Sequence, residues 1–161
     1  TRHPGLLVKF GGHAMAAGLT LLRKDLQQFD AAFDDEVRRH LSEEDLQGIV
    51  LSDGELPPAD LNLDFALTLR NAAPWGQAFP EPVFDGRFEI LDRRVVGEKH
   101  LKLLVRPSGS ERTLDAIWFN AELPERVQAG LHVFLAYRLD VNEYRGRVTP
   151  QLVVVHLDPV L

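Results

Sequence analysis

Apolar residues in the first part of the chain recur at the spacing of a helix. They are three or four positions apart and are separated mostly by charged residues or glutamine: Leu22, Leu26, Phe29, Phe33, Val37 and Leu41. Residues with this spacing share one face of an α-helix, so the pattern predicts a helix over 25–41. The same spacing in Leu61, Phe65 and Leu69, after an entry through two prolines, predicts a second helix over 59–72.

Three shorter segments around these helices complete the first half. The apolar run at 18–22 predicts a buried strand, and 46–51 predicts a short strand. Three prolines between 74 and 82 exclude regular structure there, because proline lacks an N–H donor and has a restricted φ. Trp75 and Phe79 are costly to leave exposed, so we expect this segment to be an ordered loop.

After Pro82 the pattern becomes strand-like, with turn residues at 97–98, 108–110 and 142–146. Five strands are predicted: 84–95, 100–106, 114–119, 131–141 and 147–157. A short helix is predicted at 121–129, between the third and fourth strands. This outline is typical of an OB-fold, a small five-stranded Greek-key β-barrel; an SH3-like barrel or a small sandwich is the alternative.

Together these elements predict an α+β chain in three parts. Residues 1–41 are expected to be the remnant of an α/β domain with a long helix, and 42–82 a connector with a short strand, a helix and the proline-rich loop. Residues 83–161 are expected to be the OB-fold-like β-barrel. The chain does not begin with methionine, and we expect it to be a piece of a longer one.

Composition removes several classes of protein. The absence of cysteine excludes a disulfide scaffold, a cysteine-ligated zinc or iron–sulfur site and a cysteine nucleophile. No apolar run approaches 18 residues, so we expect no membrane partner. We expect a cytoplasmic location, with which the absence of cysteine is compatible. The histidines are scattered, and Asp34, Asp35 and Glu36 fan around a helix instead of converging. We therefore expect no catalytic residue and no metal site in this chain.

Charge is distributed unevenly. The formal net charge of −6 comes from residues 23–64, which hold 4 basic and 12 acidic residues, whereas residues 65–161 are balanced. Within the balanced part, 86–106 has a local basic excess that includes Arg94, Lys99, Lys102 and Arg106. The acidic total therefore does not argue against a nucleic-acid partner for the barrel.

Two groups of residues are candidates for contacts with nucleic acid. Gly11, Gly12 and His13 suit a phosphate-binding loop, since glycines allow backbone N–H groups to approach an anion; a tight connection with a capped histidine is the alternative. OB-folds bind single strands through strands 2–3 and the loops joining strands 1–2 and 4–5. The matching barrel candidates are Arg94, Lys99, His100, Lys102, Arg106, Tyr144, Arg145 and Arg147; Trp118 is either a further candidate or part of the core.

Four segments carry a resemblance to a known family. Residues 11–19, which begin Gly-Gly-His, resemble the signature of the DHH-associated domain. Residues 73–84, 96–102 and 139–146 resemble, in the same order, segments of the RecJ exonucleases. The chain therefore looks like the C-terminal portion of a bacterial exonuclease of this family, specific for single-stranded DNA.

The resemblance implies a metal-dependent 5′–3′ nuclease of DNA recombination and repair. Its Mn²⁺ or Mg²⁺ ligands would lie in a DHH domain that is not part of this chain, so the chain alone is expected to be inactive. Gly11, Gly12 and His13 would contact substrate, and the OB-fold would hold single-stranded DNA. The family also implies the C-terminal tail of single-strand-binding protein as a partner; a barrel that docks this acidic tail on Lys99, Lys102 and Arg106 is the alternative function.

Overall fold

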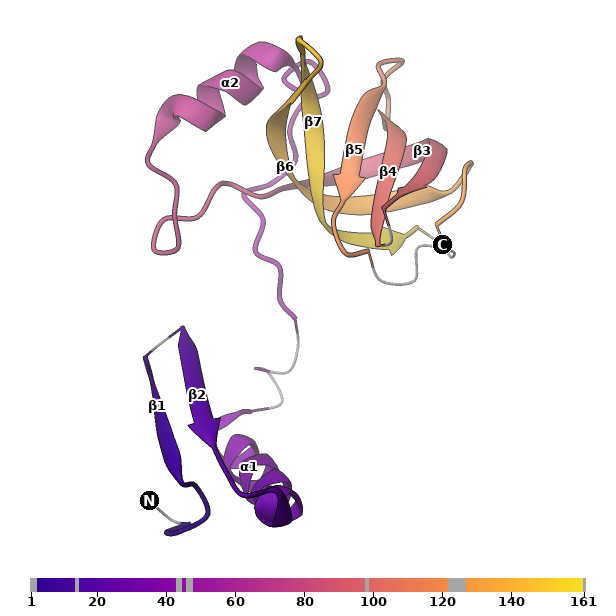
Figure 1. The fold of residues 1–161 in the computed structure, drawn as a ribbon. Helices are drawn as coiled ribbons and strands as arrows, with labels where there is room; N and C mark the ends of the chain where they lie inside the picture. The colour runs from indigo at the N-terminus through magenta and orange to yellow at the C-terminus, as the bar shows by residue number, and fades with distance from the viewer. Residues whose placement is uncertain are drawn as a thin grey trace. The chain divides into compact units, whose positions relative to one another are not determined.

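The computed structural model describes residues 3–13, 15–42, 45, 48–97, 99–121 and 127–160. The chain forms two compact units, residues 1–49 and residues 50–161, and each is described here by itself. The first holds a hairpin and a helix, and the second holds a helix and a barrel (Figure 1). Among the described residues, neither helix has the length and apolar character needed to cross a membrane.

The first unit is a β-hairpin followed by a helix. Strands β1 (Lys9–His13) and β2 (Ala16–Thr20) pair antiparallel, and a 3-10 turn, η1 (Arg23–Asp25), leads into α1 (Leu26–His40). The predicted helix over 25–41 is thus confirmed. Its last turn is basic, which suits the negative end of the helix dipole.

Two strand predictions in this part of the chain are wrong. The strand predicted at 18–22 as buried lies at 16–20, and every residue of it is exposed, because only the neighbouring strand of the hairpin pairs with it. The strand predicted at 46–51 is irregular over 48–51, where Ile49 and Leu51 are 69% and 81% exposed. Leu46 and Gln47 lie outside the described residues. A short apolar run forms a strand only where a partner strand accepts its backbone hydrogen bonds.

The second unit begins with a segment that runs beside the barrel and enters helix α2 (Leu63–Ala72). The amide of Asp53 donates to the carbonyl of Val83 at 2.7 Å. The helix prediction of 59–72 started too early, because residues 59–62 form turns and Asn62 is the cap. Its side-chain oxygen accepts a hydrogen bond from the amide of Phe65 at 2.9 Å, which satisfies one free donor of the first turn.

The predicted ordered loop after α2 is confirmed. The rings of Trp75 and Phe79 stack with their centroids 5.0 Å apart, and the indole N–H of Trp75 donates to the carbonyl of Leu69 at 2.8 Å. Phe79 remains 55% exposed, so stacking covers only part of its ring. The loop is therefore anchored to α2 by its tryptophan.

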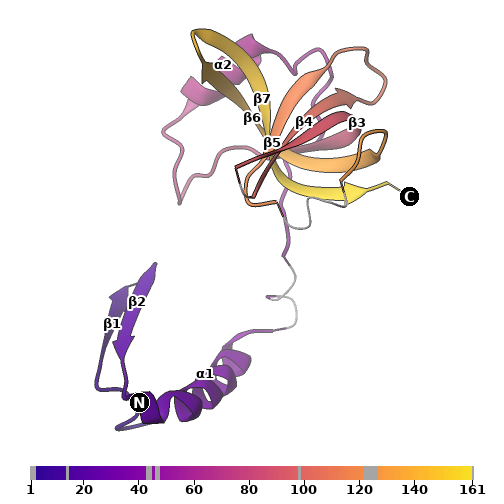
Figure 2. The ribbon, with the colours of Figure 1, turned by 45° about the vertical axis from the view of Figure 1, so that its right-hand side comes forward.

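The rest of the unit is a closed barrel of five strands, as predicted. The strands are β3 (Phe84–Val96), β4 (His100–Pro107), β5 (Leu114–Trp118), β6 (His132–Tyr144) and β7 (Arg147–Pro159). They close in the order β3-β4-β5-β7-β6, with β5 and β7 parallel and the other neighbours antiparallel (Figures 1 and 2). Closure excludes the sandwich alternative. The helix predicted at 121–129 falls mainly on 122–126, outside the described residues.

The barrel interior holds the core. Along β4, Leu101, Leu103 and Val105 are at most 1% exposed and alternate with outward-facing residues. Tyr137 of β6 packs edge-on against Phe88, with ring centroids 5.5 Å apart. Burial raises the pKa of Tyr137, with a smaller contribution from nearby carboxylates. Side chains from all five strands therefore meet in one apolar centre.

The connection between β6 and β7 differs from the predicted loop at 142–146. Strand β6 continues to Tyr144, which pairs with Arg147, so the turn consists of Arg145 and Gly146 alone. Both have positive φ, 51° and 77°, which is the conformation of a two-residue type I′ turn. This turn matches the twist of the flanking strands, and the hairpin therefore stays paired to its tip.

Candidate nucleic-acid interface

The tip of the β6–β7 hairpin carries an exposed aromatic ring between cations. Tyr144 is 62% exposed, and the guanidinium carbon of Arg145 lies 5.2 Å from the centroid of its ring. Arg147 faces Tyr144 across the hairpin. Neither arginine has a carboxylate partner among the described residues. An aromatic face beside unpaired cations can stack a base and contact phosphate.

A second group of predicted residues lies where β3 turns into β4. Arg94 pairs across the strands with Lys102, and Lys99 lies in the turn between the two strands. The ring of His100 is held by the protein: its Nδ1 accepts a hydrogen bond from the amide of Asn120 at 3.1 Å, and it packs edge-on against Phe119. In the described part of the chain, Arg94 and Lys99 have no carboxylate partner.

The cations in the middle of β4 are paired with acids. Lys102 Nζ lies 2.8 Å from Asp115, and Arg106 lies 2.6 Å from Glu89. The hydrogen bond from Arg106 lowers the pKa of Glu89, and the same bond raises the pKa of Arg106. The basic excess at 86–106 is therefore largely compensated on the outer face of β4, which the sequence count could not show.

Strand register separates the candidates into two ends of one surface. Leu101, at the start of β4, pairs with Trp118 at the end of β5, so the β3–β4 turn lies near the end of β5. Asp115 at the start of β5 pairs with Gln151, so Arg147 lies beyond that start. The hairpin tip and the β3–β4 turn thus flank the β4–β5 surface from opposite ends. Trp118 packs against the core, which favours its structural interpretation.

The Gly-Gly-His segment belongs to the first unit and is not a loop. Gly11 and Gly12 lie within β1, and His13 is its last residue. A Cβ on Gly12 would lie 2.7 Å from the Cβ of Ala17 on β2, so the close approach of the two strands requires glycine there. His13 Nδ1 accepts a hydrogen bond from the amide of Met15 at 3.2 Å. This capped histidine matches the alternative interpretation of the motif, and a phosphate contact stays a prediction.

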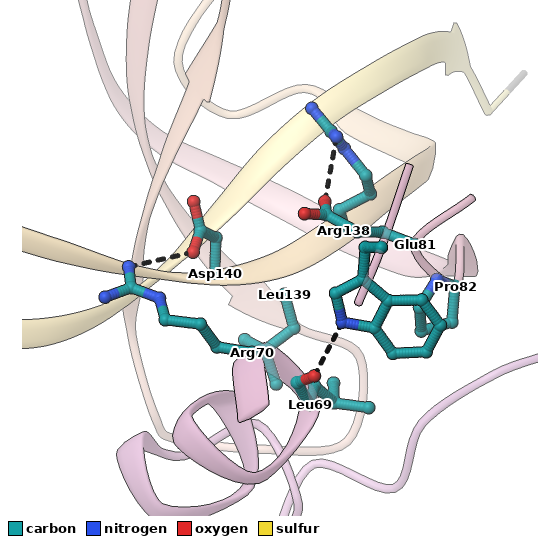
Figure 3. A pocket seen from close by; sticks show the side chains of 8 residues that line it. Leu69, Arg70, Glu81, Pro82, Arg138, Leu139 and Asp140 are labelled. Carbon is teal, nitrogen blue, oxygen red and sulfur yellow. Dashed lines mark hydrogen bonds and ion pairs between the residues drawn. The ribbon is translucent and has the colours of Figure 1, made fainter. Parts of the chain in front are cut away.

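A pocket of about 240 Å³, which no sequence motif indicates, lies between α2, the proline-rich loop and β6 (Figure 3). Two ion pairs line it, Arg70 with Asp140 at 3.1 Å and Arg138 with Glu81 at 2.8 Å. Trp75 supplies an aromatic wall. The residues of this pocket come from three distant segments, so no local motif marks it. The sequence indicates at most that Arg138 and Asp140, two apart on a strand, face the same side.

The described residues contain no group of three or more histidines and carboxylates that could hold a metal ion. The donors in this part of the chain therefore do not fit the Mn²⁺ or Mg²⁺ that the resemblance implies.

The barrel defines the class of the protein. Five strands that close in the order first-second-third-fifth-fourth are the arrangement of an OB-fold. The expected fold class is thereby confirmed.

The particular family follows from sequence comparison. The family model described as the RecJ OB domain matches residues 52–156, and the chain belongs to this family. The chain is 51% identical to the single-stranded-DNA-specific exonuclease RecJ of Dickeya dadantii and 46% identical to that of Escherichia coli. Each match covers 99% of this chain and 28% of the relative, so the chain spans little more than a quarter of these proteins.

A solved structure shows the same fold. The crystal structure of RecJ from Thermus thermophilus in complex with Mg²⁺ matches with a TM-score of 0.62 and 24% identity. The match covers 94% of this chain and 23% of that one. At this identity the likeness establishes the fold alone.

Proposed function

We propose that this chain is the part of a RecJ-type exonuclease that holds single-stranded DNA and positions it for degradation. Family membership supports this role, because the relatives are single-stranded-DNA-specific exonucleases and the matching domain is an OB domain. The full protein would act 5′ to 3′ in recombination and repair in the cytoplasm. Its Mn²⁺ or Mg²⁺ would be held by residues outside this chain.

The observation that carries the proposal is the hairpin tip. Tyr144 offers a base an exposed aromatic surface, and Arg145 and Arg147 offer phosphates two cations without carboxylate partners among the described residues. Stacking and phosphate contact together are how OB-folds bind single strands without sequence preference. The tip provides both within four residues.

The proposed path continues across the β4–β5 surface to the β3–β4 turn. Arg94 and Lys99 offer charge that no described carboxylate pairs with, and His100 is held in place by Asn120. Between the ends, Lys102 and Arg106 are paired with acids, so they contribute less to binding. In the first unit, Gly11, Gly12 and His13 are proposed to contact the substrate backbone separately from the barrel.

The experiment is fluorescence anisotropy of a labelled oligo-dT probe with the 161-residue chain. We expect binding that weakens as salt rises, because phosphate contacts release counterions. A blunt duplex of the same strand length is the control and should bind more weakly. Equal affinity for duplex and single strand, or no dependence on salt, would contradict the proposal.

Nuclease activity gives a separate check. With Mn²⁺ or Mg²⁺ present, a 5′-phosphorylated oligonucleotide should remain intact when incubated with the chain alone. Shortening at enzyme-like rates would show that catalytic groups lie within these residues.

The second candidate is docking of an acidic peptide, the class to which the C-terminal tail of single-strand-binding protein belongs. The pocket in Figure 3 is the candidate surface because it is concave and has an aromatic wall; its two arginines, like Lys102 and Arg106 on β4, are paired with acids. Trp75, Arg70 and Arg138 all line it.

Competition separates the two functions. A labelled tail peptide would be bound first, and oligo-dT would then be titrated in. Displacement places both ligands on one surface, and binding without displacement places the peptide on a separate site. If the peptide does not bind, the second function is excluded.

A further inference from the structure

Arg70 connects helix α2 to the C-terminal end of strand β6. It lies in the last turn of α2, and its guanidinium group forks between two acids of β6. Nη1 lies 2.9 Å from Oε1 of Glu143, and Nη2 lies 3.1 Å from Oδ1 of Asp140. Nη2 also donates to the carbonyl of Val141. One side chain thus holds three acceptors on a segment some seventy residues away in the sequence.

The segment it holds ends in a two-stranded ribbon that extends beyond the rest of the barrel sheet. Strand β3 pairs with β6 only as far as Tyr137, and β5 pairs with β7 only at 151–153. The residues 142–144 and 147–149 therefore pair with each other and with no other described strand. A two-stranded ribbon is only marginally stable by itself, so a contact from α2 matters at this place.

The same segment is acidic next to the surface proposed to meet DNA. Glu143 immediately precedes Tyr144, and Asp140 lies four residues before Tyr144 on the same strand. Unpaired, Glu143 would repel a polyanion at the tip within the Debye length of about 8 Å at physiological ionic strength, and Asp140, about 13 Å along the strand from Tyr144, would add repulsion at low salt, where the Debye length is longer. Paired with Arg70, they leave Arg145 and Arg147 as the charges that a phosphate meets.

We propose that Arg70 is a positioning residue for single-stranded DNA: it offsets one of the two negative charges of Asp140 and Glu143 and holds the ribbon, so that Tyr144 and its arginines face the ligand beside less uncompensated negative charge. This inference rests on the proposed function. It assigns a binding role to a helix outside the strands and loops that an OB-fold ordinarily uses.

The first test is Arg70→Gln in the 161-residue chain, measured with the labelled oligo-dT probe at low salt. We expect a loss of affinity of roughly fivefold, because two carboxylates beside the tip lose their counter-charge. Arg38→Gln is the matched control: it breaks the Arg38–Asp34 pair of α1 and removes the same charge, and affinity should stay within about twofold. An unchanged affinity for Arg70→Gln would overturn the inference.

The second test separates charge from mere support. Adding Asp140→Asn and Glu143→Gln to Arg70→Gln removes the uncompensated charge and should restore affinity to within about twofold of the parent. If Arg70 served only to hold the helix on the strand, the triple variant would bind as weakly as Arg70→Gln. That result would overturn the inference.

A third variant covers the case in which Arg70→Gln does not fold. Asp140→Asn with Glu143→Gln leaves Arg70 in place, and the amides can still accept its hydrogen bonds. Removing two negative charges should tighten binding roughly threefold; unchanged or weaker binding would overturn the inference.

Failure of this inference can be told from failure of the proposed function. Tyr144→Ala combined with Arg145→Ala and Arg147→Ala tests the tip directly. If that variant binds less well while Arg70→Gln binds normally, the tip is the DNA contact and only the role of Arg70 is wrong. If the tip variant binds normally, the tip itself is wrong.

Discussion

Large apolar residues are buried in the barrel of the second unit, whereas most of those described in the first unit are exposed. In the barrel, apolar side chains from five strands converge, and eight of the larger ones are less than 2% exposed. In residues 1–49, Leu6 is the one buried residue among those described. Large apolar residues of that unit are exposed instead, and they include both hairpin and helix positions: Val8, Phe10, Met15, Leu19, Leu22, Leu26, Phe33, Leu41 and Ile49.

The difference comes from closure. A barrel turns one face of every strand inward, so an alternating sequence is sufficient to build a core. A two-stranded hairpin and one amphipathic helix have apolar faces but enclose no interior by themselves. The barrel should therefore carry most of the stability measured for this chain, and the first unit should respond weakly to loss of apolar side chains.

The largest expected effect compares one substitution in the two units. Leu103→Ala, at a position 1% exposed, should destabilise the barrel by about 3 kcal/mol, because it removes buried methyl groups and leaves a cavity. Leu26→Ala, at a position 55% exposed, should change stability by no more than about 0.5 kcal/mol. Urea denaturation monitored by far-UV circular dichroism, which reports the helix of the first unit as well as the barrel, measures both. Equal losses would mean that the first unit has a core of its own.

The next effect concerns the hairpin of the first unit. Gly12→Ala should destabilise it by about 1–3 kcal/mol, because the new methyl group would meet Ala17 at 2.7 Å. Gly11→Ala is the control, since no atom lies within 4 Å of its added Cβ. Hydrogen exchange at the β1 and β2 amides should accelerate in the first variant alone, while the barrel amides exchange as before. Acceleration in both variants would contradict the steric explanation.

A smaller effect compares two exposed aromatic residues. Tyr144→Ala should weaken oligo-dT binding by about 1 kcal/mol, or roughly fivefold, through loss of one stacking platform. Phe10→Ala removes a ring with similar exposure, 66% against 62%, from the first unit and should leave affinity unchanged. Anisotropy titrations at fixed salt measure the pair. Equal losses would show that exposure alone, without neighbouring cations, decides the contribution.

The smallest effect depends on pH. The hydrogen bond from Arg106 lowers the pKa of Glu89 below 4.5, so the pair stabilises the barrel fully above pH 4.5 and loses this contribution as pH falls through the lowered pKa. The difference in melting temperature between the parent and Glu89→Gln should therefore shrink below pH 4.5. Asp34→Asn, which breaks an exposed pair in α1, should leave the melting temperature of the barrel unchanged. If the difference in melting temperature instead grows as the pH falls, the lowered pKa of Glu89 is contradicted.

The barrel was predictable because its signals are local. Alternation along β4 and glycines at the turns mark strands whatever surrounds them, and the predicted ends lie within three residues of the observed ones. The strand predicted at 46–51 is absent from the described residues 48–51, since no described strand pairs with this apolar run. The start of helix α2 is a third case. The two prolines predicted a start at residue 59, and only the hydrogen bond to the side chain of Asn62 shows that the helix begins after that residue.

The candidate site divides in the same way. Residue types and their order identified Tyr144, Arg145 and Arg147 as candidates, and these positions lie exposed at a hairpin tip. The compensation of Lys102 by Asp115 and of Arg106 by Glu89 was not visible, because each pair joins different strands. Arg70 was absent from every motif, since its partners lie about seventy residues away.

The sequence by itself determined the five strands, the long helix, the family resemblance and the absence of cysteine chemistry, because each depends on residue type and near-neighbour spacing. The tertiary structure alone decided which cations remain unpaired, how far the β6–β7 hairpin extends, and that α2 holds it through Arg70. These properties depend on strand register and on contacts between distant segments, and backbone closure sets both.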